Sequence, residues 1–231
     1  MISKTIIIPC FNEINTIAEI INRVEANIAN KDNIIIVDDG STDGTKEYLS
    51  EIKRENILIK FHENNYGKGV AIQTALKNEL NKIVIIQDAD LEYNPKDFKF
   101  LIKPFIETNA EVVYGSRFIG NNNYTRIHLF WHYIANKILT FICNVFTNLN
   151  MTDMETGYKC FRKEAILAID LKEKSFGIEP EITIKLAKKK FIFYEVPISY
   201  AGRSYSEGKK IGLKDAFRAI FSIIKYSLFS K

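Results

Sequence analysis

Two acidic side chains, Asp88 and Asp90, stand one residue apart, directly after a short apolar run at residues 83–86. Carboxylate oxygens are the ligands that hard cations such as Mg²⁺ and Mn²⁺ prefer, and these ions often complete their coordination shell with phosphate oxygens. The pair could therefore hold a divalent metal ion on a diphosphate. The same pattern also occurs in structural turns, so its meaning depends on the residues that accompany it.

A second acidic pair, Asp38 and Asp39, follows another apolar run in the same way, at residues 33–37. Because the carboxyl ends of parallel strands meet at one edge of a sheet, we expect both pairs to lie at that edge. An alternative is that Asp38 and Asp39 only cap the turn and helix that follow them. Two more polar segments follow apolar runs, namely Pro9-Cys10-Phe11-Asn12-Glu13 and Asn64-Asn65-Tyr66-Gly67-Lys68-Gly69.

The elements that must position these residues can be predicted from the spacing of apolar residues. Short apolar runs bounded by turn residues predict strands at 5–8, 33–37, 57–61, 83–86 and 112–114. Helical spacing between them predicts helices at 16–28, 43–52, 70–80 and 97–107. This alternation predicts an α/β fold, with a mostly parallel central sheet covered by helices on both faces.

The second half of the chain is less regular. A polar break at Asn121 to Asn123 precedes an aromatic and aliphatic segment at 127–149, which we expect to be helical. Strands are predicted at 158–161 and 191–197, with a helix between them. An apolar and basic amphipathic helix is predicted at 213–229. With no internal repeat or linker, we expect one domain over residues 1–231.

Composition excludes several classes of protein. The 231 residues are 46% hydrophobic and 26% charged, which excludes disordered and collagen-like chains. The net charge of +4 does not indicate nucleic-acid binding. The basic excess is local, because 11 Lys or Arg and only 3 acidic residues occur from Lys185 onward. The first predicted strand is not followed by a GxGxxG motif, which disfavours a dehydrogenase. The sequence also contains no uninterrupted run of about 18 apolar residues, so it does not predict a membrane-spanning helix.

The ordered set of polar segments resembles the nucleotide-sugar-binding half of family 2 glycosyltransferases. Further motifs are similar to dolichol-phosphate mannose synthases and their bacterial polyprenyl-phosphate glycosyltransferase relatives, and the resemblance covers nearly the whole chain. These motifs are Gly115-Ser116-Arg117, Thr156-Gly157-Tyr158-Lys159-Cys160-Phe161-Arg162, residues 176–181, residues 196–203 and Glu207-Gly208-Lys209-Lys210. The resemblance implies a GT-A (Rossmann-like) fold. It also implies a metal-dependent, inverting transfer of a sugar from a UDP- or GDP-sugar to a polyprenyl (dolichyl or undecaprenyl) phosphate.

The resemblance also implies roles for individual residues. Residues 1–120 would form the nucleotide-sugar-binding half, 121–210 the acceptor half and 211–231 an amphipathic C-terminal helix. The implied donor-binding residues are Pro9, Glu13, Asp38, Asp39, Lys68, Asp88 and Asp90. The implied ligands of Mg²⁺ or Mn²⁺ are Asp88, Asp90 and Glu92. The residues expected to be catalytic are Asp90, Arg117 and Arg203.

The chemistry of the acceptor explains why a catalytic base is not required. A sugar hydroxyl loses a proton as it attacks, which usually calls for a carboxylate or His. A lipid monophosphate has a second pKa of about 6, so it is already largely a dianion near neutral pH. Such an acceptor needs cationic side chains to bind its phosphate. The candidates are Arg117, Arg126, Arg203 and Lys209.

Two segments could bring the protein to the lipid. The helices at 127–149 and 213–229 could lie on an anionic membrane surface, or they could pack on the core or on a partner subunit. Many bacterial relatives carry membrane-spanning helices after this point, and this sequence does not. We therefore expect a cytoplasmic protein attached peripherally to the inner face of the membrane or through a partner. The rival interpretations are a transferase with a saccharide acceptor and a catalytically silent membrane-associated subunit. The joint presence of the acidic pairs with Arg117 and Arg203 argues against a silent subunit.

Overall fold

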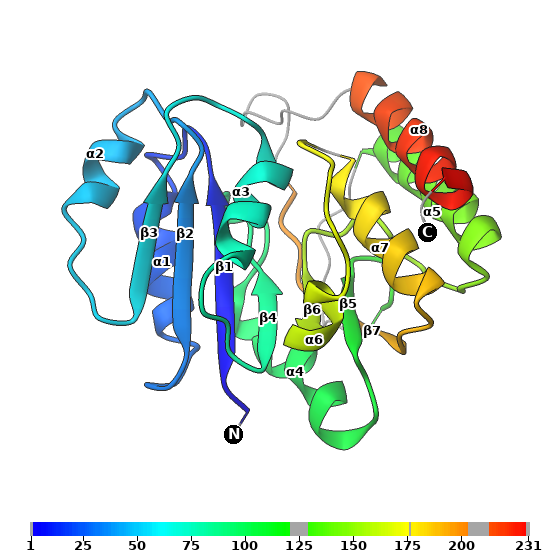
Figure 1. The fold of residues 1–231 in the computed structure, drawn as a ribbon, viewed down its shortest axis with the longest axis horizontal. Helices are drawn as coiled ribbons and strands as arrows, with labels where there is room; N and C mark the ends of the chain where they lie inside the picture. Colours follow the sequence, from blue (N-terminus) through cyan, green and yellow to red (C-terminus); the bar gives the residue numbers. More distant parts are fainter. Residues whose placement is uncertain (1, 121–128, 176, 203–212, 230–231) are drawn as a thin grey trace.

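One central sheet organises the computed structural model, which describes residues 2–120, 129–175, 177–202 and 213–229. Its strands are β1 (Lys4–Cys10), β2 (Asn33–Asp38), β3 (Ile57–Phe61), β4 (Ile83–Ile86), β5 (Val112–Ser116), β6 (Lys159–Arg162) and β7 (Phe193–Pro197). They lie in the order β3-β2-β1-β4-β6-β5-β7 (Figure 1). Only β6 is antiparallel to its neighbours, β4 and β5, so the prediction of a mostly parallel sheet is confirmed.

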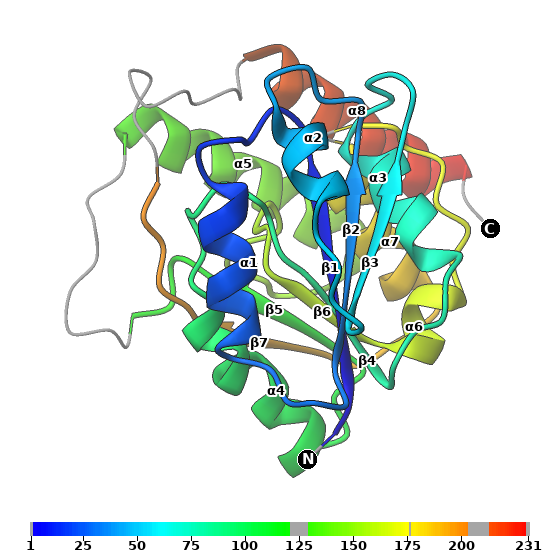
Figure 2. The same cartoon turned by 90° about the vertical axis from the view of Figure 1, so that its left-hand side faces the viewer.

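Helices cover both faces of this sheet (Figure 2). They are α1 (Ile17–Glu25), α2 (Thr45–Ser50), α3 (Lys68–Leu76), α4 (Phe98–Glu107), α5 (Phe130–Thr147), α6 (Lys163–Leu167), α7 (Ile178–Lys188) and α8 (Leu213–Phe229), and a short 3₁₀ helix, η1 (Pro95–Asp97), precedes α4. The predicted helix at 70–80 lies two to four residues too late, because α3 begins directly after Gly67. The one helix predicted between the last two strands is in fact two, α6 and α7.

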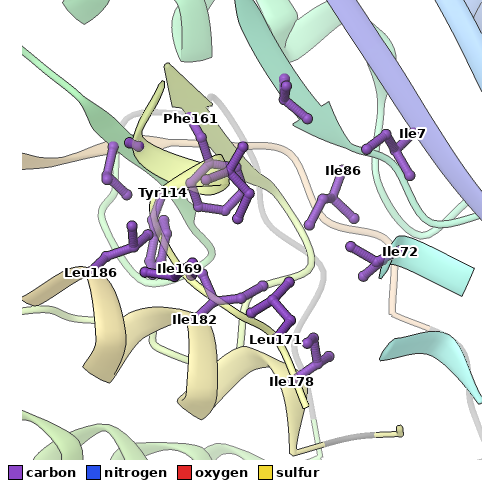
Figure 3. Close-up of a cluster of buried hydrophobic side chains, with 14 of the residues drawn as sticks. Ile7, Ile72, Ile86, Tyr114, Phe161, Ile169, Leu171, Ile178, Ile182 and Leu186 are labelled. Atoms are coloured by element: carbon purple, nitrogen blue, oxygen red, sulfur yellow. The ribbon is translucent and has the colours of Figure 1, made fainter. Parts of the chain in front are cut away.

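The two faces of the sheet bury separate clusters of apolar side chains. Successive side chains of a strand point to opposite faces. Ile6 and Ile8 of β1 therefore belong to a cluster that includes residues of α1 and α4, whereas Ile7 belongs to a second cluster that includes residues of α3 and α7. Figure 3 shows part of the second cluster, in which Tyr114 of β5 and Phe161 of β6 meet Ile182 of α7. This packing fixes the strand ends and with them the polar segments that follow.

Helices α5 and α8 lie side by side outside α7, at the upper right of Figure 1. Ala219, Ile223 and Tyr226 form the buried side of α8, and Leu139 and Cys143 form that of α5. Among the helices in the described ranges, none combines the length and the hydropathy needed to cross a bilayer.

Candidate active site

The segments that follow β1, β2 and β4 line one cavity of about 940 Å³. Eight residues selected from the sequence line it, namely Pro9, Glu13, Asp39, Lys68, Asp88, Asp90, Glu92 and Arg117. Asp38 is fully buried and is not one of the lining residues. Arg126, Arg203 and Lys209 lie outside the described residues. The structure thus gathers most of the predicted donor and metal residues in one place.

The acidic pair after β4 is presented by a tight turn. Leu91 has a φ of 59°, in a region that non-glycine residues rarely adopt and that often marks functional sites. In this turn the backbone N–H of Glu92 donates to Asp90 Oδ1 at 3.2 Å. The carboxylate of Glu92 accepts a hydrogen bond of 2.7 Å from the hydroxyl of Tyr200.

These carboxylates fit a divalent cation in the type of their oxygens and in their position on the cavity. Asp88, Asp90 and Glu92 all line the cavity, and oxygen ligands suit Mg²⁺ and Mn²⁺. Within the described ranges, however, no three His, Cys, Asp or Glu side chains are grouped as a ready-made metal centre. A bound ion would therefore need phosphate and water oxygens as further ligands. The role of Glu92 as a third ligand stays a prediction.

Lys68 joins the two halves of the cavity. Its Nζ lies 2.8 Å from Asp88 Oδ1 and 3.0 Å from Glu179 Oε1. Burial acts to lower the pKa of Lys68, but the charges of Asp88 and Glu179 outweigh it and raise that pKa well above its usual value. Lys68 is therefore a permanent cation between a carboxylate at the end of β4 and one in the first turn of α7.

The glycines beside Lys68 allow a close approach between two backbone segments. A Cβ atom on Gly67 would lie 2.2 Å from the carbonyl oxygen of Lys174, and one on Gly69 would lie 2.2 Å from that of Glu173. The φ of Gly67 is 101°, which also disfavours any larger residue. The glycines of this segment are thus explained by packing between the two halves, and Lys68 is fixed at the seam.

The two residues of the second acidic pair, Asp38 and Asp39, form hydrogen bonds with different segments. Asp39 accepts hydrogen bonds from His62 Nδ1 at 2.7 Å and from the backbone N–H groups of Tyr66 and Gly67 at 3.0 and 2.6 Å, so it holds the segment after β3. Asp38 Oδ2 accepts a bond from the backbone N–H of Ser41, which is the turn-capping alternative. The other oxygen of Asp38 is buried without a partner in the described part of the chain. Nucleoside binding by both residues stays a prediction.

Arg117 reaches the cavity but is already engaged by an acid. Its Nε and Nη2 each lie 2.7 Å from an oxygen of Asp153, whose side chain is fully buried. Burial acts to lower the pKa of Arg117, and the charge of Asp153 outweighs it, so the pKa is raised well above its ordinary value. The guanidinium is also stacked over the ring of Tyr200 at 5.1 Å. A role in binding the acceptor phosphate would rely on the N–H groups that Asp153 does not use.

The model of the family described as "Glycosyl transferase family 2" matches residues 5–169, which is well over half of the chain. The chain belongs to glycosyltransferase family 2. It is 31% identical over 229 residues to an uncharacterised protein of Methanocaldococcus jannaschii, covering 97% of this chain and 92% of that protein. It is also 31% identical over 239 residues to a UDP-N-acetylglucosamine–dolichyl-phosphate N-acetylglucosaminyltransferase of Methanococcus voltae, covering 95% and 94%.

Solved structures confirm the predicted fold of this glycosyltransferase. A glucosyl-3-phosphoglycerate synthase of Mycobacterium tuberculosis, crystallised with Mn²⁺, UDP and phosphoglyceric acid, superposes with a TM-score of 0.76. The match covers 98% of this chain and 79% of that one at 16% identity. The fold is therefore GT-A, and the family resemblance inferred from the sequence motifs is correct.

Sequence reasoning missed several residues of this family 2 glycosyltransferase that its structure places at the cavity. Glu155 and Tyr93 line it, and the Tyr93 hydroxyl accepts a bond of 2.8 Å from the backbone N–H of Gly157. A Cβ atom on Gly157 would lie 2.2 Å from Asp88 Oδ2. Both Glu155 and Gly157 adjoin or belong to a motif quoted above, but their contacts are with residues far away in the chain.

Glu155 belongs to a buried group of charges. Burial, followed by the negative charge of Glu179, raises the pKa of Glu155 from 4.5 to about 8. The positive charges of Lys159 and Arg117 act to lower this pKa, and the negative charge of Asp153 acts to raise it. Because the folded protein holds a proton that the unfolded chain releases, this group makes stability fall as the pH rises from about 4.5 to about 8.

We therefore expect Glu155→Gln to gain stability relative to the wild type as the pH rises through this window. The difference should grow steadily between pH 4.5 and pH 8, because glutamine has no proton to lose. Urea denaturation of both proteins across the range measures this difference. A difference that stays constant, or that shrinks as the pH rises, would contradict the raised pKa.

Proposed function

We propose that this glycosyltransferase moves a hexose from a nucleotide sugar to a polyprenyl phosphate at an anionic membrane surface. The observation that carries the proposal is the extent of the cavity. The cavity that contains Asp88 and Asp90 is also lined by Trp131 and Ile138 of α5 and by Ala219 of α8. A polar donor site and an apolar, outward-reaching surface thus share one space, which suits an acceptor with a charged head and a hydrocarbon tail.

The donor would lie along the edge of the sheet. Pro9 lies near the end of β1, and Glu13 and Asp39 follow β1 and β2. These residues and Asp38, the last residue of β2, would hold the nucleoside, while the diphosphate would reach Asp88 and Asp90 after β4. Mg²⁺ or Mn²⁺ held there would offset the negative charge of the departing nucleoside diphosphate. The Methanococcus relative is named for a UDP-linked donor, and the mycobacterial structure holds UDP and Mn²⁺, which supports this assignment.

The acceptor phosphate would attack the anomeric carbon directly, with inversion of its configuration. A phosphate dianion needs no general base, so the task of the protein is to orient it and balance its charge. Arg117 lines the cavity and would bind the phosphate through the N–H groups that Asp153 does not use. Arg126, Arg203 and Lys209, which lie outside the described residues, are proposed as further ligands. The dolichyl-phosphate acceptor in the name of the Methanococcus relative supports a lipid phosphate.

The outward faces of α5 and α8 would meet the membrane. Trp131 and Phe141 of α5 are 77% and 67% exposed, and Phe217 and Phe221 of α8 are 72% and 65% exposed. These side chains belong to adjacent helices (Figure 2), and exposed apolar surfaces of this kind mark interaction sites. Ile224 and Leu228 of α8 are exposed as well, whereas Ile220 of the same helix packs against the core.

The test is a transfer assay with purified protein and vesicles. A panel of UDP- and GDP-sugars with Mn²⁺ or Mg²⁺ would be offered with a short polyprenyl phosphate in anionic vesicles, in neutral vesicles or in detergent. We expect a lipid-linked sugar from one donor, formed about 10-fold faster on anionic vesicles, because basic residues near a charged surface strengthen binding. Phe221→Ser should reduce vesicle binding and transfer, while Leu167→Ser, which also removes an exposed apolar side chain, should leave both unchanged.

The same assay separates the rival functions. Transfer to a free glycan without any lipid product would show a saccharide acceptor and overturn the proposal. Binding of a nucleotide sugar with no transfer to either acceptor would indicate a silent subunit. Transfer to lipid at equal rates in anionic vesicles, neutral vesicles and detergent would reject the proposed membrane contact and support the proposed reaction.

A further inference from the structure

Two carboxyl groups that line the cavity each have one buried oxygen that forms no hydrogen bond within the described part of the chain. Glu155 Oε1 and Glu179 Oε2 have no hydrogen-bond partner in the described part of the chain, and both residues line the cavity. Glu179 is only 6% exposed. Buried polar atoms of folded proteins are nearly always paired, so two unpaired carboxyl oxygens on one cavity point to a ligand that forms hydrogen bonds with them.

Neighbouring lysines hold the side chain of Glu179 and the backbone on either side of Glu155. Lys68 binds the other oxygen of Glu179 at 3.0 Å. Lys159 donates hydrogen bonds to the carbonyl oxygens of Met154 and Thr156, the residues on either side of Glu155. The backbone that carries Glu155 and the side chain of Glu179 are thus fixed in place before any ligand arrives, as a preorganised binding site requires.

Their position along the sheet identifies the part of the ligand that they face. The sheet runs β2, β1, β4, β6, and the proposed donor places its nucleoside after β1 and β2 and its diphosphate after β4. Glu155 lies shortly before β6, which is the next strand, and Glu179 shares Lys68 with Asp88. The group that follows the diphosphate in a nucleotide sugar is the hexose.

We propose that Glu155 and Glu179 bind hydroxyl groups of the donor sugar and select the sugar that is transferred. This assignment rests on the nucleotide-sugar donor of the proposed function. Sugar hydroxyls both donate and accept hydrogen bonds, so they can pair with a carboxyl group whether it is ionised or holds a proton. A buried acceptor left without its hydroxyl discriminates strongly against a sugar that lacks it. The pair therefore accounts for sugar choice without any contact to the nucleotide.

The test compares binding of a sugar nucleotide with binding of the nucleotide alone, in the absence of lipid. Titration calorimetry with Mn²⁺ and UDP, GDP, UDP-glucose, UDP-N-acetylglucosamine and GDP-mannose would first find the preferred donor. Glu155→Met keeps the length of the side chain and removes its hydrogen bonds. We expect it to weaken binding of the preferred sugar nucleotide by about 10- to 100-fold and to change binding of the parent nucleotide by less than about 3-fold.

Two further variants make the result specific. Glu155→Gln keeps the size and an accepting oxygen, so it should retain most of the affinity that Glu155→Met loses. Glu13→Gln, at the nucleoside end of the cavity, should weaken nucleotide and sugar nucleotide equally. If Glu155→Met does not fold, Glu179→Gln, which keeps one oxygen for Lys68, should show the selective loss.

Deoxy analogues of the donor sugar identify the hydroxyl. At least one deoxy analogue should bind more weakly than the full sugar nucleotide to the wild type, and it should lose this disadvantage with Glu155→Met. An equal loss for nucleotide and sugar nucleotide, or a fall in transfer rate with unchanged donor affinity, would overturn the assignment. Selective loss without any transfer to lipid would keep this assignment and reject the lipid acceptor. No binding of any nucleotide would overturn both.

Discussion

Asp90→Ala is expected to lower the rate of sugar transfer by at least about 100- to 1,000-fold, the range seen when an electrostatic stabiliser of a transition state is removed. Asp90 lines the cavity two residues after Asp88. Its carboxylate oxygens are suited to bind a divalent ion on the donor diphosphate. Asp90 also accepts a hydrogen bond from the backbone N–H of Glu92, so the melting temperature is needed to show that the fold is kept. Transfer rate, Mn²⁺-dependent UDP affinity and melting temperature would be measured together.

A matched control is Asp170→Ala. The side chain of Asp170 is 84% exposed and does not line the cavity, so this substitution removes the same charge without touching the site. It should leave both transfer and UDP affinity unchanged. If Asp90→Ala turned over at the wild-type rate with saturating metal, the assignment of Asp90 to the metal and diphosphate would be wrong.

The parallel half of the fold could be predicted because its signals are local. The runs that became β1, β2 and β4 are short, apolar and followed by polar residues, and the carboxyl ends of parallel strands meet at one edge. The insertion of β6 between β4 and β5 could not be predicted in this way. It depends on pairing between β4 and β6, whose residues are more than 70 positions apart, such as Val84 and Phe161. The spacing of apolar residues along the sequence does not predict which distant strands pair.

The ion-pair partners within the site could not be predicted from the sequence either. Asp88, Asp90 and Lys68 could be selected by residue type and position, but the ion pair of Lys68 with Glu179 spans 111 positions. The helix predicted at 213–229 is α8, and it is apolar on two sides: Phe217 and Phe221 are exposed, whereas Ala219 and Ile223 pack inward. A helix that is apolar on two sides does not reveal its orientation until the neighbouring helices are placed.

The ion pair between Arg117 and Asp153 yields the second large prediction. Asp153→Ala should lower the free energy of unfolding by about 3 to 5 kcal/mol, because it leaves the guanidinium buried without its acid. For a chain of this length that corresponds to a fall in melting temperature of roughly 6 to 20 °C. Arg117→Ala should destabilise by a similar amount, since Asp153 is fully buried. Thermal and urea denaturation of both variants would measure this, and losses below about 1 kcal/mol would contradict a buried pair.

The double variant Arg117→Met with Asp153→Leu separates stability from catalysis. Replacing both partners of a buried pair with apolar residues often restores stability, because no uncompensated charge remains. If Arg117 also binds the acceptor phosphate, the double variant should melt near the wild-type temperature yet show a KM for polyprenyl phosphate raised by about 10-fold or more, with donor affinity unchanged. Recovery of both stability and acceptor KM would reduce Arg117 to a structural partner of Asp153. The phosphate would then have to be bound by other cations of the acceptor half.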